Sequence, residues 1–415
     1  MEKAIIIGID LGDTLIAQEM SELKELCKSC NIEVLDQEVQ KLSKINTKTY
    51  IGKGKLEEIK IAINSLDLTV AVFNDELTAS QIRNIEKILE VKIYDRTYLI
   101  LEIFKTRAKT KEASLQVEIA SLEYMLPRLV GMRKYLSRQT AGAGKIYSRG
   151  GGETALEQDR RTLSNKIVFL KKELKKLALL RKQQRSKRIK SEIPIVSLIG
   201  YTNSGKSTTL NAILKYSQAL KKEVLSKNML FATLETSTRL VQLPNNKDFL
   251  LTDTIGFISK LPHTLIESFK STLQEIQDST LILHVVDASI DMNEHIEITN
   301  KVISEIGVKD IKMIYAFNKI DLADPNFFIP KKYHPALSIS AKNDLNIDKL
   351  IELIIATIYD DHLDVSLKLP YNEMSLVNFL KKNAEIYSLD YKSDFIYINC
   401  NISKKYLYKI KDYKR

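Results

Sequence analysis

The sequence predicts an α/β protein of several domains, the largest of which holds a mostly parallel sheet with helices on both faces. Three observations support this fold class. From Pro194 to about Tyr359, short apolar strands are each followed by a helix-length segment, a pattern typical of parallel sheets. Two neighbouring segments upstream carry a sustained four-three apolar spacing, which indicates paired helices. The 415 residues are too many for one compact core.

We expect four domains along the chain. Residues 1–105 alternate strand-like runs with amphipathic helical stretches, which predicts a small N-terminal α/β domain. Residues 106–190 are predicted to form an antiparallel helical hairpin with a basic, Gly-rich loop. Residues 191–360 form the predicted large domain. Residues 361–415, rich in Tyr and Lys, predict a small α/β appendage whose role the sequence does not reveal.

The composition limits the class of protein. Apolar residues make up 44% of the chain and charged residues 28%, which is ordinary for a globular protein. No apolar stretch reaches the roughly 18 residues of a membrane-spanning helix, and the apolar run after Met1 is too short for a signal peptide. The 3 cysteines exclude a disulfide scaffold. We therefore expect a cytoplasmic protein, and we expect it to be monomeric.

The chain has a strong excess of positive charge. Its 63 Lys and Arg residues outnumber 52 Asp and Glu residues, which gives a formal net charge of +11. A net charge of this size is compatible with a polyanionic partner such as nucleic acid. Lysines spread over solvated faces would give the same net charge. Where the basic residues lie along the chain is therefore more informative about a partner than the net charge itself.

The predicted hairpin consists of two helices with the same apolar spacing. An arm of about 20 residues would be about 30 Å long, and Pro127 should end or kink the first arm. The apolar positions are Leu115, Ile119, Leu122, Leu126 and Leu129 in the first arm, and Leu163, Ile167, Leu170, Leu174 and Leu177 in the second.

The loop between the arms, residues 131–153, combines basic side chains with two tyrosines and several glycines. Basic groups for phosphates, aromatic rings for stacking and glycines for close backbone approach suit single-stranded or looped RNA. A solvated loop has the same glycines, so that interpretation stays open. The basic residues that we expect to contact RNA are Arg133, Lys134, Arg138, Lys145 and Arg149. The second arm ends in a further 10 basic residues between Lys171 and Lys190, against one acid, although a basic linker without a partner would look similar.

A phosphate-binding loop follows the first strand of the large domain. Residues 200–207 fit the pattern G-x-x-x-x-G-K-[S/T] between a strand and a helix, the context that the motif requires. The glycines let backbone N–H groups close around phosphates at a helix N-terminus. Lys206 is predicted to neutralise the β and γ phosphates, and Ser207 to ligate Mg²⁺.

Three further motifs follow later strands in the order expected of a GTP site. Asp253-Thr254-Ile255-Gly256 would hold Mg²⁺ through its carboxylate and reach the γ-phosphate through the Gly256 N–H. Asn318-Lys319-Ile320-Asp321 places a carboxylate that accepts two hydrogen bonds from guanine, whereas adenine would present a lone pair to it. Ser340-Ala341-Lys342 would set a backbone donor against guanine O6. Ligands of open α/β sheets bind at the carboxyl ends of the strands, so the motifs together predict a P-loop GTPase domain specific for guanine.

The segments 253–267 and 231–235, with Leu136-Ser137-Arg138-Gln139 and residues 149–154, resemble the HflX family of GTPases. The resemblance runs from about Tyr50 to Lys342. It implies a ribosome-associated GTPase that binds the large ribosomal subunit and its RNA, and a family whose members split ribosomes. It also implies that Thr233 is a switch threonine that senses Mg²⁺ and the γ-phosphate. Family members usually have proline where Gly151 stands.

The predicted site residues follow from the motifs and the resemblance together. We assign hydrolysis to Lys206, Thr233 and Gly256, and Mg²⁺ binding to Ser207, Thr233 and Asp253. The predicted nucleotide-binding residues are Gly200, Tyr201, Thr202, Asn203, Ser204, Gly205, Lys206, Ser207, Thr208, Phe231, Ala232, Thr233, Leu234, Asp253, Thr254, Ile255, Gly256, Asn318, Lys319, Asp321, Ser340, Ala341 and Lys342.

The residue after Gly256 is Phe257, where many GTPases have a water-orienting glutamine. A phenylalanine cannot hydrogen-bond water, so we expect slow intrinsic hydrolysis that a partner or a cation completes. Asn203 occupies the fourth position of the phosphate loop, where an asparagine carbonyl holds K⁺ in some GTPases. K⁺ at Asn203 is therefore a hypothesis, and a plain turn-forming role is its alternative.

For three other features we weigh an ordinary structural role against a chemical one. Cys27 and Cys30 have redox or zinc spacing, but no histidine lies near them in sequence, so we expect a structural role. His263 is expected to pack or contact a partner rather than act as a base. The Gly-Lys-Gly-Lys stretch at 52–55 is predicted to be a turn, either at the surface or touching phosphate.

The leading functional hypothesis is a Mg²⁺-dependent GTPase that acts on the large ribosomal subunit and splits or recycles ribosomes. The first alternative is a GTP-regulated RNA-binding or assembly factor in which hydrolysis only times release. The second is a scaffold that binds nucleotide without meaningful turnover.

Overall fold

The structure is a computed structural model, and the chain divides into two compact units that are described separately. One unit runs from Met1 to Arg185 and takes in Ile258–Thr272; the other includes Ser186–Lys227, Thr236–Phe257 and Leu273–Arg415. The structure describes residues 1–12, 16–129, 151–189 (side chains for 157–179), 193–217, 237–243, 247–254, 256–262, 265, 274–308, 310–392 and 394–414.

The N-terminal domain is built on a parallel four-stranded sheet in the order β2-β1-β3-β4. The apolar residues of β1 and β3 are buried, whereas Leu35 of β2 is exposed. Thr78 and Gln81 form a reciprocal capping box that starts α3. The elements are β1 (Glu2–Asp10), α1 (Ile16–Ser29), β2 (Ile32–Lys41), α2 (Lys53–Leu66), β3 (Val70–Phe73), α3 (Ala79–Leu89), β4 (Lys92–Asp95) and α4 (Arg96–Arg107).

The Gly-Lys-Gly-Lys stretch is not a turn, so that prediction was wrong. Gly52 is the N-cap of α2, and the three residues that follow it form the first helical turn. Lys55 Nζ lies 2.7 Å from Glu38 and 3.1 Å from Glu58. The charge of this lysine is therefore balanced within the domain.

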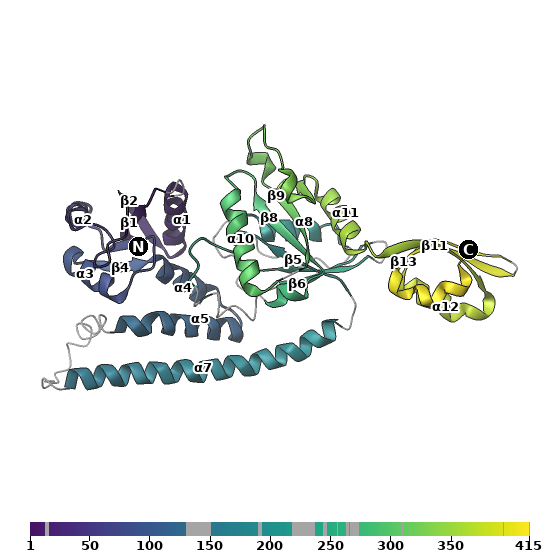
Figure 1. Cartoon of the computed structure of the whole chain (residues 1–415), viewed down its shortest axis with the longest axis horizontal. Helices are drawn as coiled ribbons and strands as arrows, with labels where there is room; N and C mark the ends of the chain where they lie inside the picture. Colours follow the sequence, from purple (N-terminus) through teal and green to yellow (C-terminus); the bar gives the residue numbers. More distant parts are fainter. Residues whose placement is uncertain are drawn as a thin grey trace. The chain divides into compact units, whose positions relative to one another are not determined.

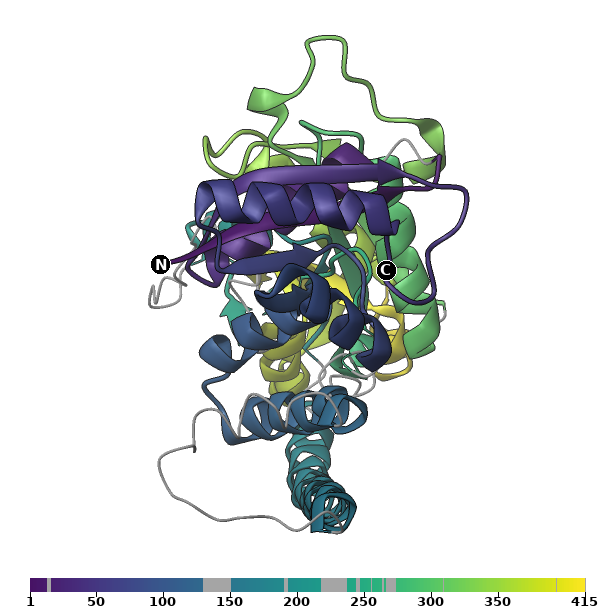
Figure 2. The ribbon, with the colours of Figure 1, turned by 90° about the vertical axis from the view of Figure 1, so that its left-hand side faces the viewer.

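The helical pair consists of α5 (Lys111–Met125) and α7 (Gly151–Ile189), which lie side by side in Figures 1 and 2. Ile119 packs against Ile167 and Leu170, three of the predicted apolar positions. Lys166–Glu118 and Lys171–Glu123 ion pairs, each at 2.7 Å, flank this contact. The α-helix α5 ends before a 3₁₀ turn, Leu126–Arg128, that contains the proline, so the predicted end at Pro127 is confirmed.

The second arm is much longer than predicted. It has 39 residues, or about 58 Å at 1.5 Å per residue, and it begins at Gly151, inside the predicted loop. The apolar spacing marks only the middle of this helix. Its polar flanks are rich in Glu, Gln, Lys and Arg, which favour helix without an apolar stripe, so apolar periodicity underestimated its length. The connection between the two arms, residues 130–150, lies outside the described part of the chain.

The large domain contains the predicted, mostly parallel sheet, in the order β10-β9-β8-β5-β7-β6. The first five of these strands are parallel, which confirms the prediction, and β6 pairs antiparallel to β7 at the edge. Strand β6 is not among the strands that the sequence predicts. The elements are β5 (Ile195–Ile199), α8 (Lys206–Leu214), β6 (Ser237–Val241), β7 (Phe249–Asp253), β8 (Leu281–Asp287), α10 (Asn293–Ile306), β9 (Lys312–Asn318), β10 (Ala336–Ser338) and α11 (Ile347–Ile358).

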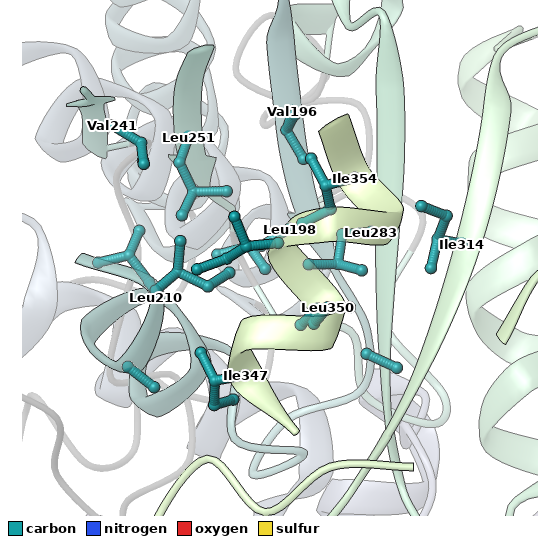
Figure 3. Packing of buried hydrophobic residues seen from close by; sticks show 14 of the residues in the cluster. Val196, Leu198, Leu210, Val241, Leu251, Leu283, Ile314, Ile347, Leu350 and Ile354 are labelled. Carbon is teal, nitrogen blue, oxygen red and sulfur yellow. The ribbon is translucent and has the colours of Figure 1, made fainter. Parts of the chain in front are cut away.

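The core of this domain lies between the sheet and the helices α8 and α11. Ile347, Leu350 and Ile354 of α11 are fully buried against sheet residues such as Leu198 and Leu283 (Figure 3). Each fully buried aliphatic side chain contributes about 1.5–3 kcal/mol through burial. This packing fixes the sheet whose carboxyl edge carries the motifs.

The C-terminal segment forms a small antiparallel sheet in the order β11-β13-β12, with its own apolar cluster. It comprises β11 (His362–Pro370), α12 (Met374–Asn383), β12 (Glu385–Tyr391), β13 (Phe395–Ser403) and α13 (Leu407–Ile410). Further 3₁₀ turns lie at Gln274–Asp278, Ile320–Leu322, Lys331–Tyr333, Tyr371–Glu373, Lys404–Tyr406 and Lys411–Tyr413. No helix in the described part of the chain is long and apolar enough to cross a membrane.

Candidate functional site

The loop between β5 and α8 has the backbone that a phosphate cradle needs. Gly200 and Gly205 have φ of +145° and +94°, a region that side chains rarely adopt. A Cβ on Gly200 would lie 2.2 Å from the Val285 carbonyl oxygen, and one on Gly205 would lie 2.1 Å from Asn318 Nδ2. Only glycine fits at either position. The backbone of the loop therefore packs directly against the Val285 carbonyl and the Asn318 amide.

Two hydroxyls of the same loop are buried without a hydrogen-bond partner. Thr202 Oγ1 and Ser204 Oγ have no such partner in the described part of the chain. A buried hydroxyl without a partner costs about 1–3 kcal/mol. A phosphate anion in the loop would offer acceptors to these groups, so the loop chemistry suits an anion.

Asn318, at the end of β9, joins two loops of the site. Its Nδ2 donates to the Ser204 carbonyl at 2.9 Å, and its Oδ1 accepts from the Ala341 N–H at 3.0 Å. The side chain is 3% exposed. It links the phosphate loop to the segment Ser340–Lys342, which sets the distance between the phosphate and base ends of the site.

Lys206 is buried at the base of the phosphate loop. Its Nζ donates to the carbonyls of Gly200 at 3.0 Å and Tyr201 at 2.6 Å. Burial lowers the pKa of Lys206 to about 8, and attraction by Asp253 opposes that shift. An incoming phosphate would supply the countercharge that favours the ammonium form. The same environment lowers the pKa of His284 to about 3, by burial and then by repulsion from Lys206, so His284 is neutral.

Asp253, at the end of β7, faces the first turn of α8. Its Oδ2 accepts a hydrogen bond from Ser207 Oγ at 2.9 Å. The hydroxyl and the carboxylate offer hard oxygen ligands of the kind that Mg²⁺ prefers. Among the described residues, no group of three or more His, Cys, Asp or Glu side chains is placed to hold a metal. A cation at this point would share these two protein ligands with phosphate oxygens.

Gly256 and Phe257 pack directly on the phosphate loop. A Cβ on Gly256 would lie 2.9 Å from Lys206 Nζ and 3.0 Å from Thr202 Cγ2. The Phe257 N–H donates to the Gly200 carbonyl at 3.1 Å, and its carbonyl accepts from the Thr202 N–H at 2.6 Å. The Phe257 side chain is 2% exposed, so it fills an apolar position and has no group that could orient water.

The predicted base-binding residues lie at the neighbouring strand ends. Asp321 is exposed in a 3₁₀ turn, with its carboxylate accessible to a ligand. Lys319 Nζ lies 2.6 Å from Asp287 Oδ2, a pairing across two strands that the motif alone did not reveal. Ser340 is buried and its Oγ accepts from the Asn343 N–H, whereas Lys342 is exposed. The structure thus brings the four motifs to one edge of one sheet.

Several predicted residues lie outside the described part of the chain. They are Phe231, Ala232, Thr233, Leu234, Ile255 and His263, together with Arg133, Lys134, Arg138, Lys145 and Arg149 of the predicted RNA loop. Cys27 and Cys30 lie in the described part of the chain and are free thiols. Burial, followed by repulsion from a neighbouring group, raises the pKa of Cys27 and of Cys30 to about 12, which suits a structural role rather than a reactive thiolate.

A phosphate loop after β5, an aspartate and glycine after β7, and an asparagine and aspartate after β9 define a P-loop GTPase, which binds guanine nucleotides and hydrolyses GTP. Family models match three successive stretches of the chain. Their descriptions are "GTP-binding GTPase N-terminal" for residues 17–105, "GTP-binding GTPase Middle Region" for 107–188 and "50S ribosome-binding GTPase" for 195–319. The chain belongs to the HflX family of GTPases.

Curated relatives resemble this chain over most of its length. GTPase HflX of Caldanaerobacter subterraneus subsp. tengcongensis is 41% identical over 403 residues, which cover 97% of this chain and 91% of the relative. GTPase HflX of Escherichia coli is 36% identical, covering 90% and 86%. Among solved structures, a GTP-binding protein from Sulfolobus solfataricus in complex with GDP is 24% identical with a TM-score of 0.46, covering 87% of this chain and 99% of that one.

We predict that Gly256→Ala selectively weakens binding of GTP. The added methyl group would lie 2.9 Å from Lys206 Nζ and displace the lysine or the glycine backbone. Titration with a non-hydrolysable GTP analogue and with GDP should show a loss of about tenfold or more for the analogue and a smaller loss for GDP. Gly54→Ala, where a Cβ meets nothing within 4 Å, is the control. Wild-type analogue affinity in Gly256→Ala would contradict the close contact.

We predict that Asp321→Asn switches base preference from guanine to xanthine. Xanthine offers a carbonyl where guanine has its amino group, so it complements an amide in place of the carboxylate. Competition between GTP and xanthosine triphosphate measures the change. Asp324→Asn, at another exposed aspartate three residues on, should keep GTP preference. Equal GTP affinity in wild type and Asp321→Asn would remove this residue from base recognition.

Proposed function

We propose that this GTPase binds the large ribosomal subunit and uses its GTP cycle to split or recycle ribosomes. The observation that carries the proposal is the long basic helix α7, in a chain whose GTPase domain matches the model described as "50S ribosome-binding GTPase". With 39 residues against 15 in α5, more than half of α7 extends beyond its partner helix (Figure 1). Most of the described side chains of α7, between residues 157 and 179, are exposed, and such a surface is suited to contact another molecule.

The charge on α7 supports an RNA partner. Lys171, Lys172, Lys175 and Lys176 are exposed on successive turns. Lys171 and Lys176 have carboxylate partners at 2.7 and 2.8 Å, whereas Lys172 and Lys175 have no ion pair in the described part of the chain. Lysines in such a row neutralise successive phosphates and release counterions. The loop residues before α7 add five further basic groups to the proposed contact.

Mg²⁺ is held by Ser207 and Asp253 in this proposal, with Thr233 of the switch segment as a further ligand. When bound, the ion neutralises charge on the β and γ phosphates. Lys206 binds the same phosphates, and the backbone N–H groups of the phosphate loop orient them. The Gly256 N–H contacts the γ-phosphate. Asn318 ties the phosphate loop to the base-binding segment through its bonds to the Ser204 carbonyl and the Ala341 N–H, and its amide keeps one donor and one acceptor for the base.

Hydrolysis is slow in the isolated protein, because Phe257 stands where many GTPases have a water-orienting glutamine. Its buried side chain has no polar group that could orient water. The ribosome completes the site or orders the water. Sedimentation with purified ribosomes, with a GTP analogue or with GDP, separates the candidate functions. Comigration with large subunits and loss of whole ribosomes supports splitting. Comigration without loss indicates a factor whose hydrolysis only times release, and the absence of turnover with ribosomes indicates a scaffold.

We predict that ribosome binding falls steeply with salt and depends on the loop before α7. Between 50 and 200 mM salt, affinity should fall by about a decade or more if several phosphates are contacted. Alanine at Arg133, Lys134, Arg138 and Arg149 should abolish association and leave GTP affinity unchanged. Alanine at Lys381, Lys382, Lys404 and Lys411, four exposed residues of the C-terminal domain, removes the same charge and should preserve association. Retained binding in the loop variant would assign the loop to solvent.

We predict that K⁺ accelerates hydrolysis if Asn203 holds the ion. Asn203 is exposed, with φ of +61°, in the phosphate loop, and a cation there would offset charge that develops on the phosphates in the transition state. Hydrolysis is compared in K⁺ and Na⁺ at equal ionic strength, with and without ribosomes. A rate more than about twofold higher in K⁺, lost in Asn203→Ala, supports the ion. Rates that agree within twofold in both settings leave the ribosome to orient the water.

A further inference from the structure

One ion pair of the nucleotide site joins a motif residue, Lys319, to a residue outside the motifs, Asp287. Lys319 directly follows β9, and Asp287 is the last residue of the neighbouring strand β8 (Figure 1). The two strands are parallel, with Asp287 opposite Asn318. Both residues therefore stand at the carboxyl edge of the sheet, where ligands of such sheets bind. None of the four sequence motifs includes Asp287.

The carboxylate of Asp287 is held in one orientation. Its Oδ2 lies 2.6 Å from Lys319 Nζ, while its Oδ1 accepts hydrogen bonds from the Ser289 N–H at 3.0 Å and from Ser289 Oγ at 2.6 Å. The Asp287 side chain is 10% exposed and the Lys319 side chain is 24% exposed. A carboxylate with both oxygens engaged and little contact with water has little freedom to rotate, so it fixes the position of the ammonium group.

The backbone at the other end of the lysine side chain is fixed as well. The Asn318 carbonyl accepts a hydrogen bond from the Ala288 N–H at 2.8 Å. The Ile320 N–H donates to the Ile339 carbonyl at 3.2 Å. Lys319 stands between these two anchors, at the start of a 3₁₀ turn. Because its Cα and its Nζ are both held, the methylene groups between them run from β9 towards the end of β8.

The methylene groups of Lys319 lie next to the residue predicted to recognise guanine. Asp321 follows in the same 3₁₀ turn, and it is exposed to a ligand. A purine whose edge meets that carboxylate turns its ring faces to the side chains on either side of the ring plane. The methylene groups of a lysine cover an apolar ring face when the charged end is held elsewhere, and they exclude water from it. A lysine whose ammonium is not held would extend into solvent and would lose rotamer freedom on binding.

We propose that Asp287 is a positioning residue of the guanine site, which holds Lys319 so that its methylene groups form a wall against the flat face of the base. Asp321 reads the edge of the base, and the wall contacts its face. Purines differ at their edges and share their ring face, so Asp287 contributes affinity without selecting between purines. GTP and GDP carry the same base, so Asp287 contributes equally to the binding of both. The inference rests on the guanine site predicted at Asp321 and not on ribosome binding.

The test uses Asp287→Asn in the full chain, which keeps the shape of the side chain and removes the charge that holds Lys319. Affinities for GTP and for GDP should both fall about three- to tenfold, by the same factor. Affinity for inosine triphosphate, which lacks the amino group of guanine, should fall by that factor too, so the ratio of GTP to inosine triphosphate affinity stays unchanged. In Asp321→Asn that ratio should fall. Asp360→Asn is the control, because Asp360 pairs with Lys312 at the other end of β9, and it should change each affinity by less than about twofold.

A double-mutant cycle shows whether Asp287 acts through Lys319, a coupling that a merely structural carboxylate would not give. Lys319→Met should also weaken GTP and GDP equally, and adding Asp287→Asn to Lys319→Met should weaken neither by more than a further factor of about two. Two effects that multiply would overturn the proposal, as would unchanged affinities, a loss confined to GTP, or an altered ratio of GTP to inosine triphosphate affinity in Asp287→Asn. A wild-type ratio in Asp321→Asn would show that the guanine edge is read elsewhere, while the cycle would still decide whether Asp287 and Lys319 act as a pair.

Discussion

The side-chain amide of Asn318 is the contact on which the geometry of the nucleotide site depends. It fixes the phosphate loop through Ser204 and the base-binding segment through Ala341, so neither loop moves without the other. The contact is possible only because Gly205 lacks a Cβ, which would fall 2.1 Å from the amide nitrogen. Asn318, which the sequence predicts to bind the nucleotide, therefore also has a positioning role. The sheet beneath, packed by α11, holds Asn318 at the carboxyl end of β9.

Gly256 lies in the chain between two sets of contacts, one to the phosphate loop and one, through Ser259, within the N-terminal unit. On one side it packs against Lys206 and Thr202 of the phosphate loop, and after it Phe257 pairs by both backbone groups with that loop. Three residues further on, Ser259 is held by a buried arginine of the N-terminal domain. A glycine at 256 is thus required because the backbone closely approaches the phosphate loop. The side chain of Ser259, three residues later, contacts the N-terminal domain.

The parts of the site predictable from sequence are those with local causes. The phosphate loop, Asp253 and Asp321 stand next to strand ends in short motifs, and the structure brings their segments to one sheet edge. The Arg96–Ser259 contact joins residues 163 positions apart, of types found everywhere on protein surfaces, so no pattern marks it. The sequence did not predict the length of α7 for a related reason. Its flanks are helical because of the intrinsic helix propensity of their residues, and no apolar stripe marks them. Strand β6 is a short edge strand of mixed polarity, which periodicity rarely distinguishes from a loop.

The absence of a polar side chain at Phe257 has a consequence for how such a site is used. A glutamine at this position would let the isolated protein position its own water. Phe257 instead is 2% exposed and stabilises the packing of the glycine against the phosphate loop. In the proposed mechanism the chain supplies nucleotide binding, while the group that orients the water comes from the ribosome. In that mechanism slow intrinsic turnover would give the GTP-bound form a long lifetime, so that hydrolysis waits for an encounter with the partner.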